Sequence, residues 1–170
     1  MTDKEKLKYM KAAIKCAQKG AGLDEVPVGA VIVRDGKIIA RAHNLKEAKK
    51  CSNYHAETVA IDKACKAIGD WHLNECDIFV TLEPCAMCAG ALINARIRGV
   101  YFGAYDHKAG CCGTLYNLLS DERFNHRPYV EGGIMQAECA ELLSSYFKEK
   151  RQQKKSVISG AVEKSHSKEV

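Results

Sequence analysis

The hydrophobic pattern of the first 44 residues predicts a helix followed by a β-hairpin. Apolar residues recur at helical spacing between positions 7 and 17, and Gly20 stands where such a helix would end. The stretch PVGAVIVRDGKIIARAHN then predicts two strands joined by Asp35-Gly36, a pair of residues that is typical of a two-residue hairpin turn.

The rest of the chain alternates short apolar runs with amphipathic segments. HAETVAIDKACKAIG predicts a helix, and DIFVTL predicts a buried strand that runs into EPCAMCAGALINAR, a helix opening at Pro84. GVYFGA predicts another strand, TLYNLLSDERF a short helix, YVEGGI a last strand and AECAELLSSYFKEKRQ a last helix. This order predicts a single α/β domain, with helices on both faces of one sheet.

The length and composition are those of one globular domain. The chain has 170 residues, of which 46% are hydrophobic and 28% are charged. No apolar run is long enough for a membrane helix, and the N-terminus lacks the apolar core of a secretory signal. Nine cysteines, an odd number without an export signal, favour reduced thiols in the cytoplasm over a disulfide framework.

The net charge of +5 is concentrated at the C-terminal end. Residues 148–170 hold seven Lys/Arg and three Asp/Glu, whereas residues 1–147 hold nineteen and eighteen. A basic end is expected where a protein meets a polyanion, although a solvated tail is the alternative. We therefore expect a domain over residues 1–151 and a basic, disordered tail over residues 152–170.

The stretch TLEPCAMCAG, residues 81–90, holds two cysteines that can share one metal ion. Cys85 and Cys88 are three residues apart, so on a helix both sulfurs face the same way. Pro84 places them in the first turn, where free N–H groups and the helix dipole favour thiolates. A structural zinc site would need a second Cys/His pair, and the adjacent Cys111 and Cys112 have poor geometry for chelation.

The sequence HAE at residues 55–57 offers the missing ligand. Residues two apart on an ideal helix point about 200° away from each other, so only one of His55 and Glu57 is expected to bind the metal unless the helix start is irregular. Imidazole suits zinc beside two thiolates, which leaves Glu57 free. Three ligands leave a fourth position for water, as in catalytic zinc sites, and an unligated carboxylate can transfer that water's protons.

Together these pieces form H-x-E, a spacer of twenty-six residues, and P-C-x-x-C, which matches the signature of zinc nucleobase deaminases. The chain resembles the cytidine deaminase superfamily and, within it, the bacterial tRNA-specific adenosine deaminases. The resemblance covers about residues 5–152 and rests on EVPVGAV, HN, HAE, VTLEPCAMCAGA, VYFGA, FNHR and ECAELLSSYFKEKR. The two-residue spacer between the cysteines differs from that of the similar riboflavin-pathway deaminases.

The resemblance implies a three-layer α/β/α fold with a mixed five-stranded sheet, one Zn²⁺ per subunit and a homodimer. It implies hydrolysis of the wobble adenosine of a tRNA anticodon to inosine, with His55, Cys85 and Cys88 as zinc ligands and Glu57 as proton shuttle. It also implies that Asn44 holds the target nucleoside. The other residues expected to bind substrate are Ala56, Asp106, Asn125, His126 and Arg127.

Phosphate contacts are expected from Lys148, Lys150 and Arg151, and from Lys108 and Arg127 in loops. Three alternatives remain at this point. A free-base or nucleoside deaminase would use the same site without needing a basic surface. A zinc-stabilised RNA-binding module would not need Glu57, and a thioredoxin-like redox protein would need a low-potential dithiol.

Overall fold

The computed structural model describes the backbone of residues 1–166 and the side chains of residues 1–156. The helices and strands follow the predicted order closely. In chain order they are α1 (Asp3–Ala21), β1 (Gly29–Arg34), β2 (Lys37–His43), α2 (Lys46–Lys49), α3 (Ala56–Ile68), β3 (Cys76–Leu82), α4 (Ala86–Asn94), β4 (Gly99–Ala104), the 3-10 turn η1 (Leu118–Ser120), β5 (Tyr129–Glu131) and α5 (Gln136–His166).

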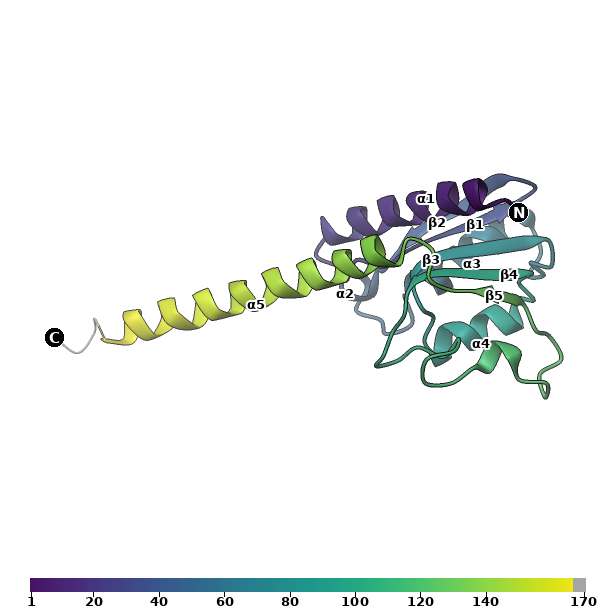
Figure 1. Ribbon diagram of the computed structural model, residues 1–170. Coiled ribbons are helices and arrows are strands. Elements are labelled where there is room, and N and C mark those ends of the chain that lie inside the picture. The colour runs from purple at the N-terminus through teal and green to yellow at the C-terminus, as the bar shows by residue number, and fades with distance from the viewer. Residues whose placement is uncertain (167–170) are drawn as a thin grey trace.

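The five strands form one mixed sheet in the order β2-β1-β3-β4-β5 (Figure 1). β1 pairs antiparallel with both β2 and β3, whereas β3, β4 and β5 run parallel. Because β3, β4 and β5 are parallel, their carboxyl ends lie at the same edge of the sheet. This edge is where β3 leads into the cysteine-bearing helix α4.

Helices cover both faces of the sheet, which confirms the three-layer α/β/α prediction (Figure 1). On one face α1 and the beginning of α5 pack on a cluster centred on Met10, Val31 and Phe79. On the other face α3 and α4 pack on a larger cluster that includes Ile32 and Leu92. The layers hold the N-termini of α3 and α4 beside each other, which positions the site described below.

The β1–β2 hairpin forms where the sequence predicts it. Asp35 and Gly36 both have positive φ, 49° and 72°. Two consecutive positive φ values define the turn whose twist matches that of antiparallel strands, which explains the preference for Asp-Gly here. The pairing shifts by one residue between Ile32 and Val33.

Three local features differ from the predictions. The helix expected in TLYNLLSDERF is only the turn η1, because most of this segment forms an irregular loop whose Asp121 binds Arg123. The four-residue helix α2 was not predicted. The sequence predicts a disordered tail over residues 152–170, whereas α5 runs as far as His166, and residues 167–170 lie outside the part of the chain that the structure describes. Residues 152–166 contain no proline, and their Gln, Lys, Ala and Glu residues favour a helix.

α1 approaches β1 so closely at Gly29 that a larger residue there would clash with the backbone of the helix. A Cβ atom at Gly29 would lie 2.1 Å from the carbonyl oxygen of Ala13 and 2.4 Å from the nitrogen of Ala17. Gly29→Ala is therefore expected to lower the free energy of unfolding by about 1–3 kcal/mol, because the helix must move away from the strand. Denaturant titration measures this loss.

Gly90, inside α4, is the matched control, because a Cβ atom there would meet nothing within 4 Å. Gly90→Ala should stabilise the protein by up to about 1 kcal/mol through its better helix propensity. Equal stability losses in the two variants would contradict the packing argument.

Within the described residues, no helix is both long and apolar enough to cross a membrane.

Candidate active site

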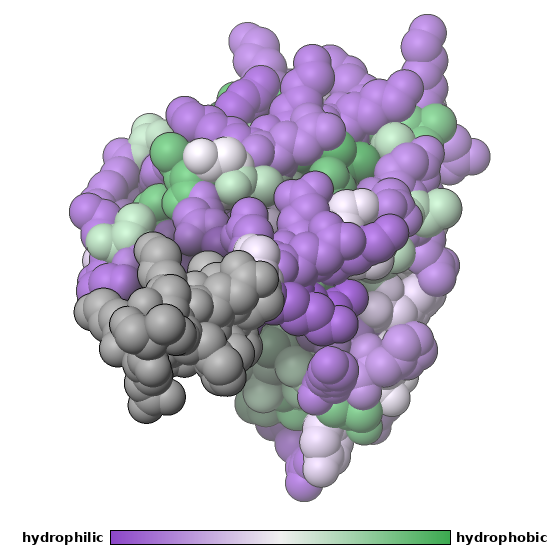
Figure 2. Space-filling model, turned by 90° about the vertical axis from the view of Figure 1, so that its left-hand side faces the viewer, coloured by the Kyte–Doolittle hydropathy of each residue, from purple (hydrophilic) through white to green (hydrophobic). Residues whose placement is uncertain are grey.

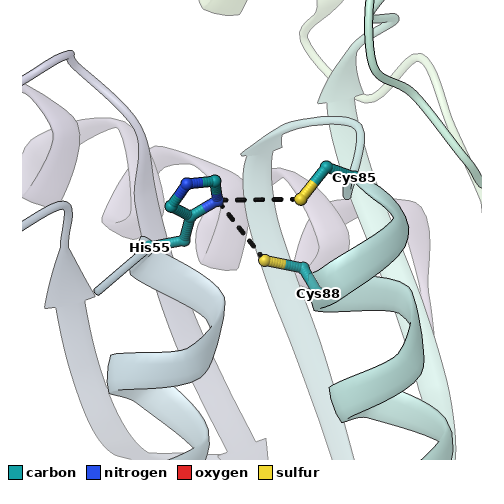
Figure 3. Close-up of side chains that lie close together, drawn as sticks. All are labelled: His55, Cys85 and Cys88. Carbon is teal, nitrogen blue, oxygen red and sulfur yellow. Dashed lines mark hydrogen bonds between the residues drawn. The ribbon is translucent and has the colours of Figure 1, made fainter. Parts of the chain in front are cut away.

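Three potential metal ligands meet at the N-termini of α3 and α4. The Nδ1 atom of His55 lies 3.7 Å from the Sγ atom of Cys85 and 3.6 Å from that of Cys88 (Figure 3). The three potential ligand atoms all lie within 4.8 Å of one another. Cys88 is buried, whereas His55 and Cys85 are half-buried. The group, called the His-Cys-Cys group below, is therefore open to solvent on one side.

The spacing of these atoms fits a zinc ion. In tetrahedral zinc sites the Zn–S and Zn–N distances of about 2.3 and 2.0–2.1 Å place S and N about 3.5 Å apart. The observed separations of 3.6 and 3.7 Å come within 0.2 Å of that value. One imidazole and two thiols are the donor set that favours zinc over harder cations.

The starts of the two helices explain why these residues converge. His55 and Cys85 are the N-cap residues of α3 and α4, both with extended backbone. Neither side chain caps its helix, so each is free to point toward the other helix. Cys88 lies in the first turn of α4. The helix predicted to open at Pro84 therefore begins at Ala86, and both helix dipoles favour negative charge at the site.

Glu57 lies beside this group even though it is only two residues from His55. The argument from an ideal helix would separate the two side chains, but His55 precedes the helix, with ψ of 158°. Glu57 is 4% exposed and forms a hydrogen bond with Cys88. Burial raises the pKa of Glu57 to about 7. A carboxyl group with that proton affinity can both take up and release a proton near neutral pH.

The two cysteines differ in their affinity for a proton when no metal is bound. Hydrogen bonds from the Cys88 thiol and from the His55 ring lower the pKa of Cys85 to about 4. The pKa of Cys88 is raised by its hydrogen bond to Cys85 and by burial. A thiolate at Cys85 next to an imidazole gives the site a ready first ligand for a divalent cation.

Asn44 joins the end of β2 to the start of α3. Its Oδ1 atom accepts a hydrogen bond of 2.9 Å from the backbone N–H of Ala56, which is fully buried. This bond satisfies one of the free N–H groups of the first helical turn. The side chain of Thr58 donates to the carbonyl oxygen of His55 at 3.0 Å. Asn44 and Ala56, both predicted to bind substrate, therefore lie next to the His-Cys-Cys group.

Glu83 is a buried carboxylate whose structural role the sequence analysis missed. It is 2% exposed and accepts backbone N–H groups of Asp106, Cys112 and Thr114, each at 3.0 Å, and the hydroxyl of Thr114. It holds the loop between β4 and η1 against the segment that carries Cys85. Its position directly after the apolar run DIFVTL could have indicated a buried carboxylate, because charged residues are rarely buried without partners.

Glu83→Gln is expected to lower the free energy of unfolding by about 1–3 kcal/mol, because an amide NH₂ group would replace one acceptor oxygen opposite backbone donors. Hydrogen exchange should become faster at the amides of residues 106–114. Glu122, which is exposed, provides the control variant Glu122→Gln. Unchanged exchange in the loop of the Glu83 variant would show that the carboxylate does not order it.

Asp106 lies in this same loop. Its Oδ1 atom accepts the backbone N–H groups of Lys108 and Ala109, and Gly110 pairs with Cys85 as an isolated β-bridge. The carboxylate of Asp106, predicted to bind substrate, is thus also part of the turn that brings the loop to the site.

Asn125, His126 and Arg127 lie in the loop before β5, away from the His-Cys-Cys group. The Nε2 atom of His126 lies 2.7 Å from the carbonyl oxygen of Ile97, in the connection between α4 and β4. β4 begins beside the beginning of β3, whereas Cys85 follows the end of β3. Within one chain these three residues and the His-Cys-Cys group therefore lie at opposite edges of the sheet.

The cations expected to contact phosphate differ in their surroundings. Lys150 forms an ion pair with Asp24, which partly neutralises it. Lys108, Lys148 and Arg151 are exposed. α5, which carries Lys148 and Arg151, extends away from the body of the molecule (Figure 1).

Comparisons with known proteins identify the family of this chain. Residues 4–151 match the model of the MafB19-like deaminase family. The tRNA-specific adenosine deaminase of Bacillus subtilis (strain 168) is 54% identical over 147 residues, which cover 86% of this chain and 91% of that protein. The protein of the same name from Agrobacterium fabrum is 42% identical over 147 residues, covering 86% and 97%.

Solved structures give the same picture. A structure from a study of A-to-I editing by tRNA:A34 deaminases has a TM-score of 0.77 and 41% identity, and covers 79% of this chain and 98% of its own. A guanine deaminase from Bacillus subtilis has a TM-score of 0.57 and 32% identity, covering 73% and 83%. The chain belongs to the MafB19-like deaminase family and to the family of tRNA-specific adenosine deaminases.

Proposed function

We propose that this protein hydrolyses the adenosine at the wobble position of a tRNA anticodon to inosine, with release of ammonia. The observation that carries the proposal is the His-Cys-Cys group beside the buried carboxyl of Glu57. It supports a hydrolytic deaminase because three ligands leave a metal ion with an open position next to a proton carrier. The identity of 54% to a tRNA-specific adenosine deaminase supports the choice of substrate.

In this proposal His55, Cys85 and Cys88 hold one zinc ion. When bound there, zinc would act as a Lewis acid and lower the pKa of a coordinated water molecule. Glu57 takes one proton from the attacking water and delivers it to N1 of the adenine ring as the C6–O bond forms. It then takes the second proton from the same oxygen and delivers it to the amine, so that the C6–N bond breaks and ammonia leaves.

Asn44 would orient the nucleoside. Its Oδ1 atom is engaged by the N–H of Ala56, so its side-chain NH₂ group is the donor that faces an acceptor on the substrate. The target base must leave its stack to reach the site, and a splayed anticodon loop makes this cheaper than a duplex does.

The proposal also includes a homodimer in the cytoplasm, formed by the deaminase domain over residues 1–151. Asn125, His126 and Arg127 lie across the sheet from the His-Cys-Cys group of their own chain. A second subunit would allow these residues to contact an RNA bound in the partner's site. This arrangement would reconcile their expected role in substrate binding with their position.

The test is to incubate the zinc-loaded protein with an anticodon stem-loop that carries adenosine at the wobble position, and to read inosine by sequencing. We expect inosine at that position and at no other adenosine of the loop. Guanine, free adenosine and cytosine serve as competing small substrates. Ammonia release from one of these, without inosine in the RNA, would assign the same chemistry to a free-base or nucleoside deaminase.

A further inference from the structure

The exposed face of α1 carries an unbroken row of lysines. The row, called the lysine stripe below, consists of Lys4, Lys8, Lys11, Lys15 and Lys19. Successive residues of a helix are rotated by about 100°, so these five lysines lie within a sector of about 80° around the helix axis. All five side chains are exposed, and the buried face of α1 lies on the opposite side.

The stripe borders a hollow that contains further cations. A cavity of about 360 Å³ lies between α1 and the edge strand β2, and none of the described residues that line it is acidic. Arg41 of β2 and Lys63 of α3 line it together with four lysines of the stripe. The ammonium group of Lys63 donates to the carbonyl oxygen of Arg41 at 2.9 Å. This cluster therefore spans three elements of the fold.

A merely solvated helix face would be expected to mix charges. Lysines four residues apart repel each other and destabilise a helix by about 0.2–0.5 kcal/mol per pair. Lys4 and Lys8, Lys11 and Lys15, and Lys15 and Lys19 are such pairs. By contrast, Lys6, which belongs to the other side of the helix, pairs with Asp3 and Glu131. The repulsion among the lysines of this face favours a polyanionic partner for it.

The C-terminal end of the stripe, at Lys19, lies at the same edge of the sheet as the His-Cys-Cys group. Gly20, next to Lys19, packs so closely on His43 that a Cβ atom there would lie 3.1 Å from the Cβ of His43. The next residue is Asn44, which binds the start of α3. From Lys19 to Lys4 the helix rises about 22 Å away from that edge. Hydrophilic residues dominate the upper part of Figure 2, where α1 lies.

We infer that the lysine stripe, with Arg41 and Lys63, binds the ribose–phosphate backbone of the RNA stem that leads to the nucleotide in the active site. Lysines spaced along about 22 Å can contact several phosphates of one strand, and such contacts position an RNA without reading its sequence. The inference rests on the proposed function, because it assigns a second surface to the same RNA. It adds a docking surface on α1 to the basic C-terminal end.

The test measures binding of a long-stem hairpin RNA whose loop lacks adenosine, by fluorescence anisotropy at several salt concentrations. The variant combines Lys8→Gln, Lys11→Gln, Lys15→Gln and Lys19→Gln in the zinc-loaded full chain. Each phosphate contact contributes about 0.7–0.9 to the magnitude of the slope of log K against log salt, so loss of four contacts should lower that magnitude by about 3 to 4. Binding should weaken about ten-fold or more near 0.1 M salt.

Two control variants and one kinetic measurement make the result specific. Arginine at the same four positions preserves the charge and should preserve the slope. Lys66→Gln removes one exposed charge on α3 and should change binding less than Lys15→Gln does. For inosine formation from a wobble-adenosine hairpin with the same stem, the glutamine variant should raise KM and leave kcat within about two-fold, since uniform binding is lost.

An unchanged salt slope in the glutamine variant would overturn the inference, even if the wild-type protein forms inosine. Loss of binding to phosphatidylserine vesicles, with an unchanged slope for RNA, would also overturn it and would assign the stripe to a lipid surface. If the slope falls but no RNA is deaminated by the wild type, the docking surface stands and the proposed reaction fails.

Discussion

Glu57→Gln should reduce the rate of inosine formation by about 10²- to 10⁴-fold, because a positioned proton carrier contributes that much to catalysis. The amide has nearly the shape of the carboxylate but cannot shuttle protons between water, the ring nitrogen and the amine. Zinc content should not change, because Glu57 is not one of the three clustered ligands. Single-turnover assays with metal analysis measure both quantities.

Glu138→Gln is a suitable control, since Glu138 is exposed on α5. It should retain wild-type turnover. A Glu57→Gln variant that keeps more than about a tenth of the wild-type rate would mean that another group moves the proton. A variant that loses its zinc would instead show that Glu57 helps to hold the metal.

Cys88→Ala should abolish both zinc binding and turnover, because it removes one of only three ligands from the His-Cys-Cys group. Zinc that binds only the folded state stabilises it by about 4 kcal/mol at a thousand times its dissociation constant. For a chain of this size that corresponds to a rise in melting temperature of about 8–16 °C. The variant should lose this zinc-dependent rise.

Cys76 provides a control of equal burial, since it is 1% exposed at the start of β3, at the other edge of the sheet. Cys76→Ala should lower the melting temperature through lost packing but keep the rise on adding zinc. Calorimetry with and without a chelator separates the two effects. A zinc-dependent rise that survives in Cys88→Ala would place the metal elsewhere.

Much of the fold could be predicted because local signals and burial agree. The hairpin at Asp35-Gly36 and the strand at residues 99–104 form where turn chemistry and an apolar run indicate. The order of the strands in the sheet could not be read from periodicity, because pairing depends on contacts between distant segments. Only the resemblance to a family supplied the mixed five-stranded sheet.

The meeting of His55, Cys85 and Cys88 could be predicted from residue type and spacing, but its geometry could not. The helical wheel predicts that only one of His55 and Glu57 binds a metal, and the clustered group contains His55 but not Glu57. It could not give their positions, because His55 is the cap of α3 and not part of it. The role of Glu83 was missed because its partners, such as Thr114, are about thirty residues away in the sequence. Backbone donors of a loop leave no side-chain pattern to recognise.

Hydrolysis of a wobble adenosine by the His-Cys-Cys group and Glu57 would place an oxygen atom from water at C6. The zinc-loaded protein is incubated with an anticodon stem-loop in ¹⁸O-labelled water, and the nucleosides are analysed by mass spectrometry. We expect inosine at the wobble position with ¹⁸O at C6, and no such inosine with the Glu57→Gln variant. Absence of inosine, or inosine without the label, would contradict this mechanism.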